Sequence, residues 1–265
     1  MAYSSPMTAA SRLLLALAAV GAASDPAAAE PPGATPPSLE VPVLIAVARC
    51  PAEATASAPA AARPSAAPAE RVRPAAAGAA PTLAPVRSRE WIDEHLRGAA
   101  RVFDPLGIVL KPTIEEFTPE RCDLFTRGQR DALARHVTRP AVATVLVVRR
   151  VRDLDVKDYD LMGVHWRYGG PDPTLAGRTW IFLTGRARPP VLAHELGHYF
   201  GLPHDRRGGT LMTPGPSDPA WRQRRRRPHA FAEVLRPQQV RRLRAGARAF
   251  LARAAERRPS PQPEP

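Results

Sequence analysis

Three histidines and one glutamate share an eleven-residue segment, HELGHYFGLPH, at positions 194–204. On a helix, residues four apart lie on one face, so His194 and His198 could bind one metal ion. Gly201 could then end the helix in a left-handed conformation, and the following turn would bring His204 back as a third ligand. Neutral imidazole is a good zinc ligand, and three protein ligands leave a fourth position for water, which is typical of a catalytic site.

Glu195 follows the first histidine and is not needed for coordination. We expect it to act as a general base that takes a proton from water, whose pKa zinc lowers, before attack on a peptide carbonyl. The alternative is a helix whose histidines merely pack or face solvent. That alternative is disfavoured, because the segment fixes five positions and uses three of only seven histidines.

The segment resembles the metzincin consensus H-E-x-x-H-x-x-G-x-x-H, and GGTLMTP at 208–214 resembles the Met-turn of that family. By this resemblance Met212 would lie beneath the metal as an apolar floor, and its short spacing from His204 is similar to the matrixin branch. Residues 99–110, AARVFDPLGIVL, are also similar to matrixin catalytic domains. The resemblance implies a zinc-dependent endopeptidase with one catalytic Zn²⁺ and a protein or peptide substrate, which would pair with an edge strand at 164–168.

Some positions depart from the matrixin pattern. Asp205 stands where matrixins usually have Ser, as in the adamalysin branch, and no Tyr follows Met212. His165 matches a structural-zinc ligand of matrixins, but Trp180 replaces its partner, so we interpret His165 as a strand residue. Calcium could bind loop carboxylates, although solvated carboxylates are the favoured interpretation for Asp153, Asp155, Asp158, Asp160 and Asp172.

Hydrophobic patterns predict the fold class, which is α/β of the α+β, zincin-like kind. Short apolar runs predict strands at 41–48, from 108, at 142–148, 164–168 and 179–184. Helical spacing predicts helices at 88–103, at 129–137, from 189 through the histidines, and at 237–257. Together these predict a mixed, mostly parallel five-stranded sheet with an antiparallel edge strand, an active-site helix and a C-terminal helix.

The two ends of the chain differ in composition from its middle. Residues 1–29 carry a basic Arg12, an apolar run at 13–23 and small residues at 27–29, which predict a signal peptide and export to the periplasm or beyond the cell. We expect a flexible segment at 30–40, a catalytic domain at 41–257 interrupted by an Ala/Pro-rich linker at 51–87, and a disordered tail at 258–265. No apolar run is long enough to span a membrane.

The chain has two cysteines, Cys50 and Cys122. An even number is typical of exported proteins, whose cysteines pair as disulfides. In the sheet that the resemblance implies, the strands before them are parallel neighbours, which predicts a disulfide that contributes about 2–4 kcal/mol. Two alternatives stay open. The cysteines could be buried free thiols, or Cys50 could be a thiolate that occupies the open zinc position in a latent precursor.

The formal charge of +13 comes almost entirely from arginine. RQRRRR at 222–227 predicts a preference for acidic residues on the primed side of the cut bond, and a solvated loop is the alternative.

Two other function classes compete with a peptidase. One is a non-catalytic zincin-like binding domain, which would not need Glu195. The other is a basic protein that binds anionic surfaces. The sequence shows no basic face interleaved with stacking aromatic residues, so we expect no specific nucleic-acid partner. We also expect a monomer.

Overall fold

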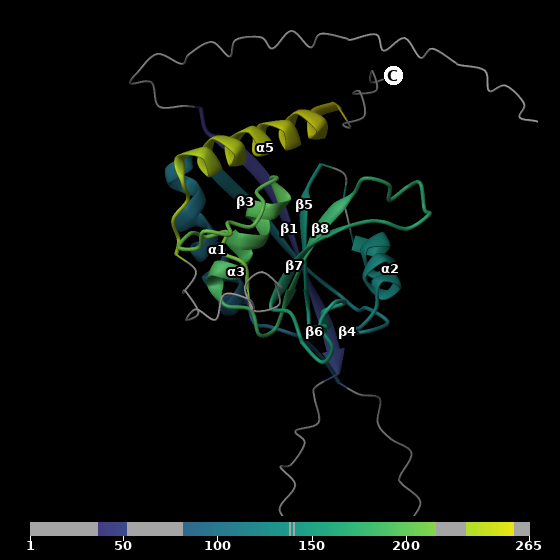
Figure 1. The fold of residues 1–265 in the computed structure, drawn as a ribbon. Helices are drawn as coiled ribbons and strands as arrows, with labels where there is room; N and C mark the ends of the chain where they lie inside the picture. The colour runs from purple at the N-terminus through teal and green to yellow at the C-terminus, as the bar shows by residue number, and fades with distance from the viewer. Residues whose placement is uncertain (1–36, 52–81, 138, 140, 216–231, 257–265) are drawn as a thin grey trace, which may run out of the picture. The chain divides into compact units, whose positions relative to one another are not determined.

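A central sheet organises the computed structural model, which describes residues 37–51, 82–137, 139, 141–215 and 232–256 (Figure 1). Four neighbouring strands run parallel, in the order β3 (Ile108–Phe117), β1 (Leu39–Pro51), β5 (Ala143–Val148) and β8 (Thr179–Thr184). β7 (Gly163–Arg167) pairs antiparallel with β8 at one edge. A short sixth strand, β2 (Leu83–Pro85), pairs antiparallel with the last residues of β1.

The central strands are continuous apolar runs because both of their faces are covered. Every residue of β5 is buried, as are Val43, Ile45 and Val47 of β1 on one face and Leu44 and Ala46 on the other. Near-continuous apolar sequence is typical of parallel strands packed between two layers.

Helices α1 (Arg89–Phe103), α3 (Pro189–Tyr199) and α5 (Pro237–Glu256) cover one face of the sheet. Helix α2 (Arg127–Val137) lies on the other face, as Figure 1 shows. The backbone of α5 passes so close to the end of α3 that a Cβ on Gly246 would lie 1.9 Å from the carbonyl oxygen of Phe200. This contact ties the C-terminal helix to the helix that carries the histidines.

The connections reverse direction at the middle of the sheet. From β1 the chain passes through α1 on one face to β3, and from β3 it passes through α2 on the other face to β5. The strand order therefore reverses between β1 and β5. In open α/β sheets, a crevice outside the carboxyl ends of the strands forms at such a switch point.

The predicted α/β class and mostly parallel sheet with an antiparallel edge strand are confirmed at this coarse level. Two details were wrong. The sheet has six strands and not five, because the short strand β2 forms within the predicted linker. β1 also pairs over more residues than predicted, which lets its last residues pair with β2. A separate two-stranded sheet of β4 (Asp123–Leu124) and β6 (Arg150–Val151) was not predicted.

Cys50 and Cys122 form a disulfide, with their Cα atoms 6.0 Å apart. The bond joins the end of β1 to the segment that enters β4, and both cysteines are buried in the hydrophobic cluster beside α2. The predicted disulfide is confirmed, and the two free-thiol alternatives, including Cys50 as a metal-bound thiolate, are excluded.

Several predictions fall on residues that the structure does not describe. These are the signal peptide, most of the flexible segment and of the Ala/Pro-rich linker, and the C-terminal tail. Among the residues that are described, no helix combines the length and the apolar character needed to cross a membrane.

Candidate metal centre

Helix α3 orients two histidines toward one point. It begins at Pro189; proline lacks a backbone N–H, but the first N–H groups of a helix have no partner within the helix in any case. The helix is buried from Val191 to Gly197. Nδ1 of His194 lies 2.7 Å from the carbonyl oxygen of Leu211, and Nδ1 of His198 lies 2.7 Å from that of Leu202. The two Nε2 atoms face each other at 3.1 Å.

The protonation state of the two imidazoles favours a bound cation between their Nε2 atoms. Each neutral imidazole carries one N–H, and the bond to a backbone carbonyl places that hydrogen on Nδ1. Burial lowers the pKa of His194 to about 3 and that of His198 to about 4, so neither ring gains a second proton at neutral pH. Both Nε2 atoms then present lone pairs to each other, an arrangement that a bound cation stabilises.

His204 completes a group of three. Its ring centroid lies 4.6 Å from that of His198 and 5.5 Å from that of His194, and one ligand atom from each residue falls within 4.8 Å of the others. Gly201, with φ of +91°, makes the turn that returns the chain toward the helix. Within the described parts of the chain, these histidines are the only group of three or more metal-ligating side chains.

The donor set fits zinc. Nitrogens bound at about 2.0–2.1 Å to a tetrahedral ion are about 3.3–3.4 Å apart, close to the 3.1 Å between the two Nε2 atoms. Because two of the imidazoles already donate Nδ1–H to carbonyl oxygens, their tautomers are set for coordination through Nε2. His204 is the exposed member of the group, so solvent can reach the site from its side.

Asp205 holds the loop that carries the third histidine. Its carboxylate accepts bonds from the backbone N–H of Arg207 at 2.9 Å and from Nε of Arg236 at 2.8 Å. Burial opposes ionisation, but the bond from Arg236 keeps the pKa of Asp205 below its ordinary value. Arg236 immediately precedes α5, so this ion pair fastens the loop to the C-terminal helix.

Met212 packs against α3 at Gly197, the residue before His198. It is fully buried, and a Cβ on Gly197 would lie 2.6 Å from its sulfur. Only glycine leaves room for this contact. The residue before Met212 supplies the carbonyl that orients His194, so the turn and the helix determine the ligand position together.

Glu195 is buried one residue beyond the first ligand. Its carboxylate accepts a bond from the backbone N–H of His165, yet burial raises the pKa of Glu195 to about 8. Gly163 of β7 crosses the helix here, and a Cβ on it would lie 3.0 Å from Cγ of Glu195 and 2.6 Å from Cγ1 of Val191. A carboxyl group in so apolar a place, beside three histidines that could hold a cation, is suited to proton transfer.

A cleft of about 500 Å³ contains the three histidines and Glu195. The edge strand β7 contributes Gly163 to Trp166 to its wall, and Arg127 and Arg130 of α2 and the loop at 153–155 also line it. The side of β7 that faces away from β8 pairs with no described strand. An extended chain could therefore lie along β7 beside the histidines.

Sequence reasoning missed the arginines in this cleft. The guanidinium carbons of Arg127 and Arg130 each lie 4.6 Å from the ring centroid of Trp166, whose Nε1 donates to Asp131 at 2.7 Å. Burial lowers the pKa of Arg130 to about 10, and its Nε has no partner among the described residues. In the sequence they resemble any arginines of a surface helix, and nothing there indicates their packing on a tryptophan.

The remaining candidates are not part of the group of three histidines, although His165, Asp153 and Asp155 line the same cleft. His165 is in β7 as predicted, with its ring centroid 6.5 Å from that of His198, while Trp180 is buried on the opposite face of the sheet. The five loop aspartates do not gather around one point. Asp160 and Asp158 pair with arginines, Asp172 with Arg135, and Asp153 accepts bonds within its own turn.

Residues 222–227, the basic run predicted to favour acidic residues in the substrate, lie outside the described residues. No protein-family model matches the chain, and no curated protein sequence matches it either.

Proposed function

We propose that the protein is a zinc-dependent endopeptidase of the metzincin type, with a zincin-like fold close to the matrixin branch. One observation carries the proposal. Two imidazoles, each fixed by a bond to a backbone carbonyl, present facing Nε2 atoms 3.1 Å apart, and a buried carboxyl group lies next to one of them on the same helix. A structural site would not need that carboxyl group.

Zinc would be held by His194, His198 and His204, and when bound it would polarise a peptide carbonyl and lower the pKa of a coordinated water. Glu195 would accept the proton of the attacking water at a carboxylate oxygen. It would then return that proton to the nitrogen of the leaving amine. The raised pKa of Glu195 favours this second step, and the positive charge of a metal would bring the pKa down toward the range that the first step needs.

The free edge of β7 supports a peptide as substrate. Its unpaired backbone groups would bind an extended chain as an added antiparallel strand, so most of the affinity would come from main-chain bonds. Alternate side chains of such a substrate would point toward α3 and toward α2. This arrangement suits an endopeptidase, because the cleft can extend along the strand on both sides of the cut bond.

Export is part of the proposal. A disulfide and the lack of a membrane-crossing helix among the described residues are compatible with an oxidising compartment. The signal-like composition of residues 1–29 gives the route.

The test measures metal and activity in the same samples. Glu195→Gln keeps the shape of the side chain but cannot accept the proton, so we expect one zinc per chain, as in the wild type, and a loss of casein hydrolysis of about a hundredfold or more. His204→Ala should lose both zinc and activity. The matched control is Glu94→Gln, an exposed residue of α1, which should change neither.

Each readout can contradict a different part of the proposal. Full hydrolysis by zinc-loaded Glu195→Gln would refute the role of the base. A wild-type protein that binds zinc tightly but cleaves no peptide in a degenerate library would instead indicate a binding domain. Unchanged zinc affinity in His204→Ala would show that the third ligand is another residue.

A further inference from the structure

We propose that the protein has a second ligand site, which binds a phosphate or sulfate group in an arginine-lined pocket at the carboxyl ends of the parallel strands. The pocket has a volume of about 500 Å³ and shares no lining residue with the cleft that holds the histidines. Its charged lining consists of one carboxylate and four guanidinium groups, from Asp160, Arg87, Arg149, Arg150 and Arg186. The proposal does not depend on the peptidase function.

The fold itself brings these arginines together. Arg149 and Arg150 directly follow β5, Arg186 follows β8 by two residues, and the end of β1 supplies Cys50 and Pro51 to the same pocket. Since β1, β5 and β8 are parallel, their carboxyl ends meet at one edge of the sheet. This edge includes the β1/β5 switch point, where ligands bind in open α/β sheets.

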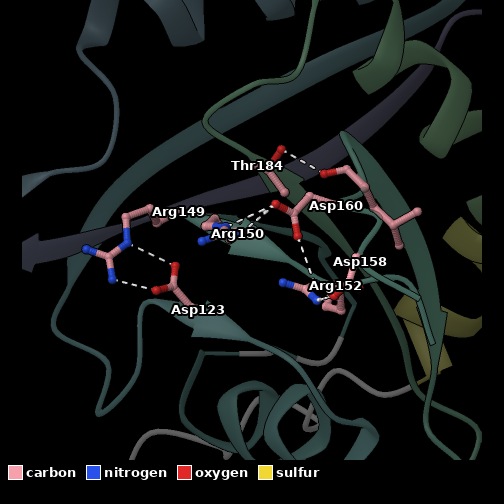
Figure 2. Close-up of polar contacts among 8 residues, drawn as sticks. Asp123, Arg149, Arg150, Arg152, Asp158, Asp160 and Thr184 are labelled. Carbon is pink, nitrogen blue, oxygen red and sulfur yellow. Dashed lines mark hydrogen bonds and ion pairs between the residues drawn. The ribbon is translucent and has the colours of Figure 1, made fainter. Parts of the chain in front are cut away.

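Two carboxylates fix the central arginines without neutralising the pocket. Figure 2 shows Arg149 forked on Asp123, with Nε–Oδ1 at 2.9 Å and Nη2–Oδ2 at 2.6 Å. It also shows Arg150 with Nε and Nη2 on one oxygen of Asp160, at 3.0 and 2.8 Å. Arg152 also binds Asp160, and Asp158 balances its charge. The four guanidinium groups of the pocket against Asp123 and Asp160 therefore leave two positive charges, the charge that a phosphate or sulfate dianion complements.

Donors remain for a ligand. Arg87 places Nε and Nη2 on the carbonyl oxygen of Gly185, and Arg150 places the same two atoms on Asp160, so no described residue accepts a bond from either Nη1. Arg186 is exposed and has no hydrogen-bond or ion-pair partner among the described residues. Guanidinium groups match the oxygens of phosphate and sulfate in a forked geometry.

Solvated arginine is the alternative in so arginine-rich a chain. The anchoring described above argues against it, because Arg87, Arg149 and Arg150 are each held by two N–H groups to fixed acceptors. Long side chains that are already ordered lose little entropy when they bind a ligand. The pocket is thus preorganised, whereas an ordinary surface arginine is not.

The experiment measures binding by isothermal titration calorimetry to the full chain in a low-salt buffer free of phosphate and sulfate. Inorganic phosphate and inorganic sulfate are the free-ion probes, and dextran sulfate is the polymer-borne probe. Arg186→Glu reverses an exposed charge in the pocket, and we expect it to weaken binding by about tenfold or more. Arg87→Gln, which removes the charge and the guanidinium group but leaves a polar side chain, is a second variant, expected to weaken binding in the same direction. Arg241→Glu makes the same charge change at an exposed position of α5 outside the pocket, and we expect it to leave binding unchanged.

The probes and the control separate the outcomes. Binding of the free ions that is lost in Arg186→Glu but kept in Arg241→Glu supports the site and assigns it a small anion. Binding of dextran sulfate alone, with the same dependence on Arg186, supports the site and assigns it a group on a polymer. Equal weakening in Arg241→Glu, or no binding of any probe by the wild type, overturns the proposal. Circular dichroism of each variant checks that the pocket variants fold.

Discussion

Removing the disulfide should lower the free energy of unfolding by about 4 kcal/mol. The bond joins residues that are 72 positions apart, and closing a loop of that length in the unfolded chain has an entropy equivalent to about 4.4 kcal/mol at 25 °C in the chain-entropy model. Small domains have a total stability of roughly 5–15 kcal/mol, so the loss would be a large fraction. For a domain of this size it corresponds to roughly 8–16 °C in the melting temperature.

The assay is urea unfolding of the wild type and of the double variant Cys50→Ala/Cys122→Ala, with a chelator present in both so that metal binding does not contribute. Alanine is the replacement of choice because both cysteines are buried in an apolar cluster, where serine would bury hydroxyl groups. Since the bond acts by restricting the unfolded chain, the double variant should also show a larger m-value, reflecting a more expanded unfolded state.

Two results would refute this reasoning. An unchanged urea midpoint would mean that the bond contributes nothing to stability at this position. A lower midpoint with an unchanged m-value would place the loss in native packing, and not in the unfolded chain. Wild-type protein reduced under native conditions provides the comparison that retains both sulfur atoms.

Three further predictions concern the candidate metal centre. Gly197→Ala would place a methyl group 2.6 Å from the sulfur of Met212 and displace the turn that orients His194. Zinc affinity, measured in competition with a chromogenic chelator, should therefore fall about 10–100-fold. Equal affinity would show that the turn adapts. Arg236→Ala removes the ion pair that fastens the third-ligand loop to α5. Because Arg236 is partly exposed, we expect a loss of only about 1 kcal/mol in urea unfolding, and no loss would show that the other bonds of Asp205 suffice. In the metal-free protein, burial raises the pKa of Glu195 from 4.5 to about 8. Between pH 4.5 and 8 the folded protein therefore keeps the proton on Glu195, whereas the unfolded chain has released it. The stability of the wild type relative to Glu195→Gln should therefore decrease by up to about 1.4 kcal/mol per unit as pH rises from 4.5 to 8, and a difference that does not change with pH would contradict the shift.

The strands and helices that could be predicted from the sequence are those in which burial imposes a pattern of apolar residues. β5 and β8 could be predicted because a parallel strand covered on both faces is apolar at nearly every position. β2 could not, because its three residues pair through their backbone with the end of β1 and lie at the border of an Ala/Pro-rich stretch. The two-residue strands β4 and β6 are too short to show any period.

The candidate site divides in the same way. Helical spacing brings the histidines together, so a local motif predicts them. The groups that orient them are backbone carbonyls of Leu202 and Leu211, which leave no trace in side-chain identity. The arginine pocket is invisible for another reason. Its arginines come from three segments of an arginine-rich chain, and only the pairing of the strands that precede them brings them to one place.

The two outer edges of the sheet differ in how well they resist unwanted pairing. The outer side of β3 pairs with no described strand, but the exposed stretch around Lys111 and Pro112 carries a charge and lacks one backbone donor, both of which discourage aggregation. β7 has no proline, Gly163 interrupts its side-chain cover, and its one charge, Arg167, is at its last residue. Concentrated protein should therefore self-associate through β7, and extended peptides that fill the cleft should keep it dispersed.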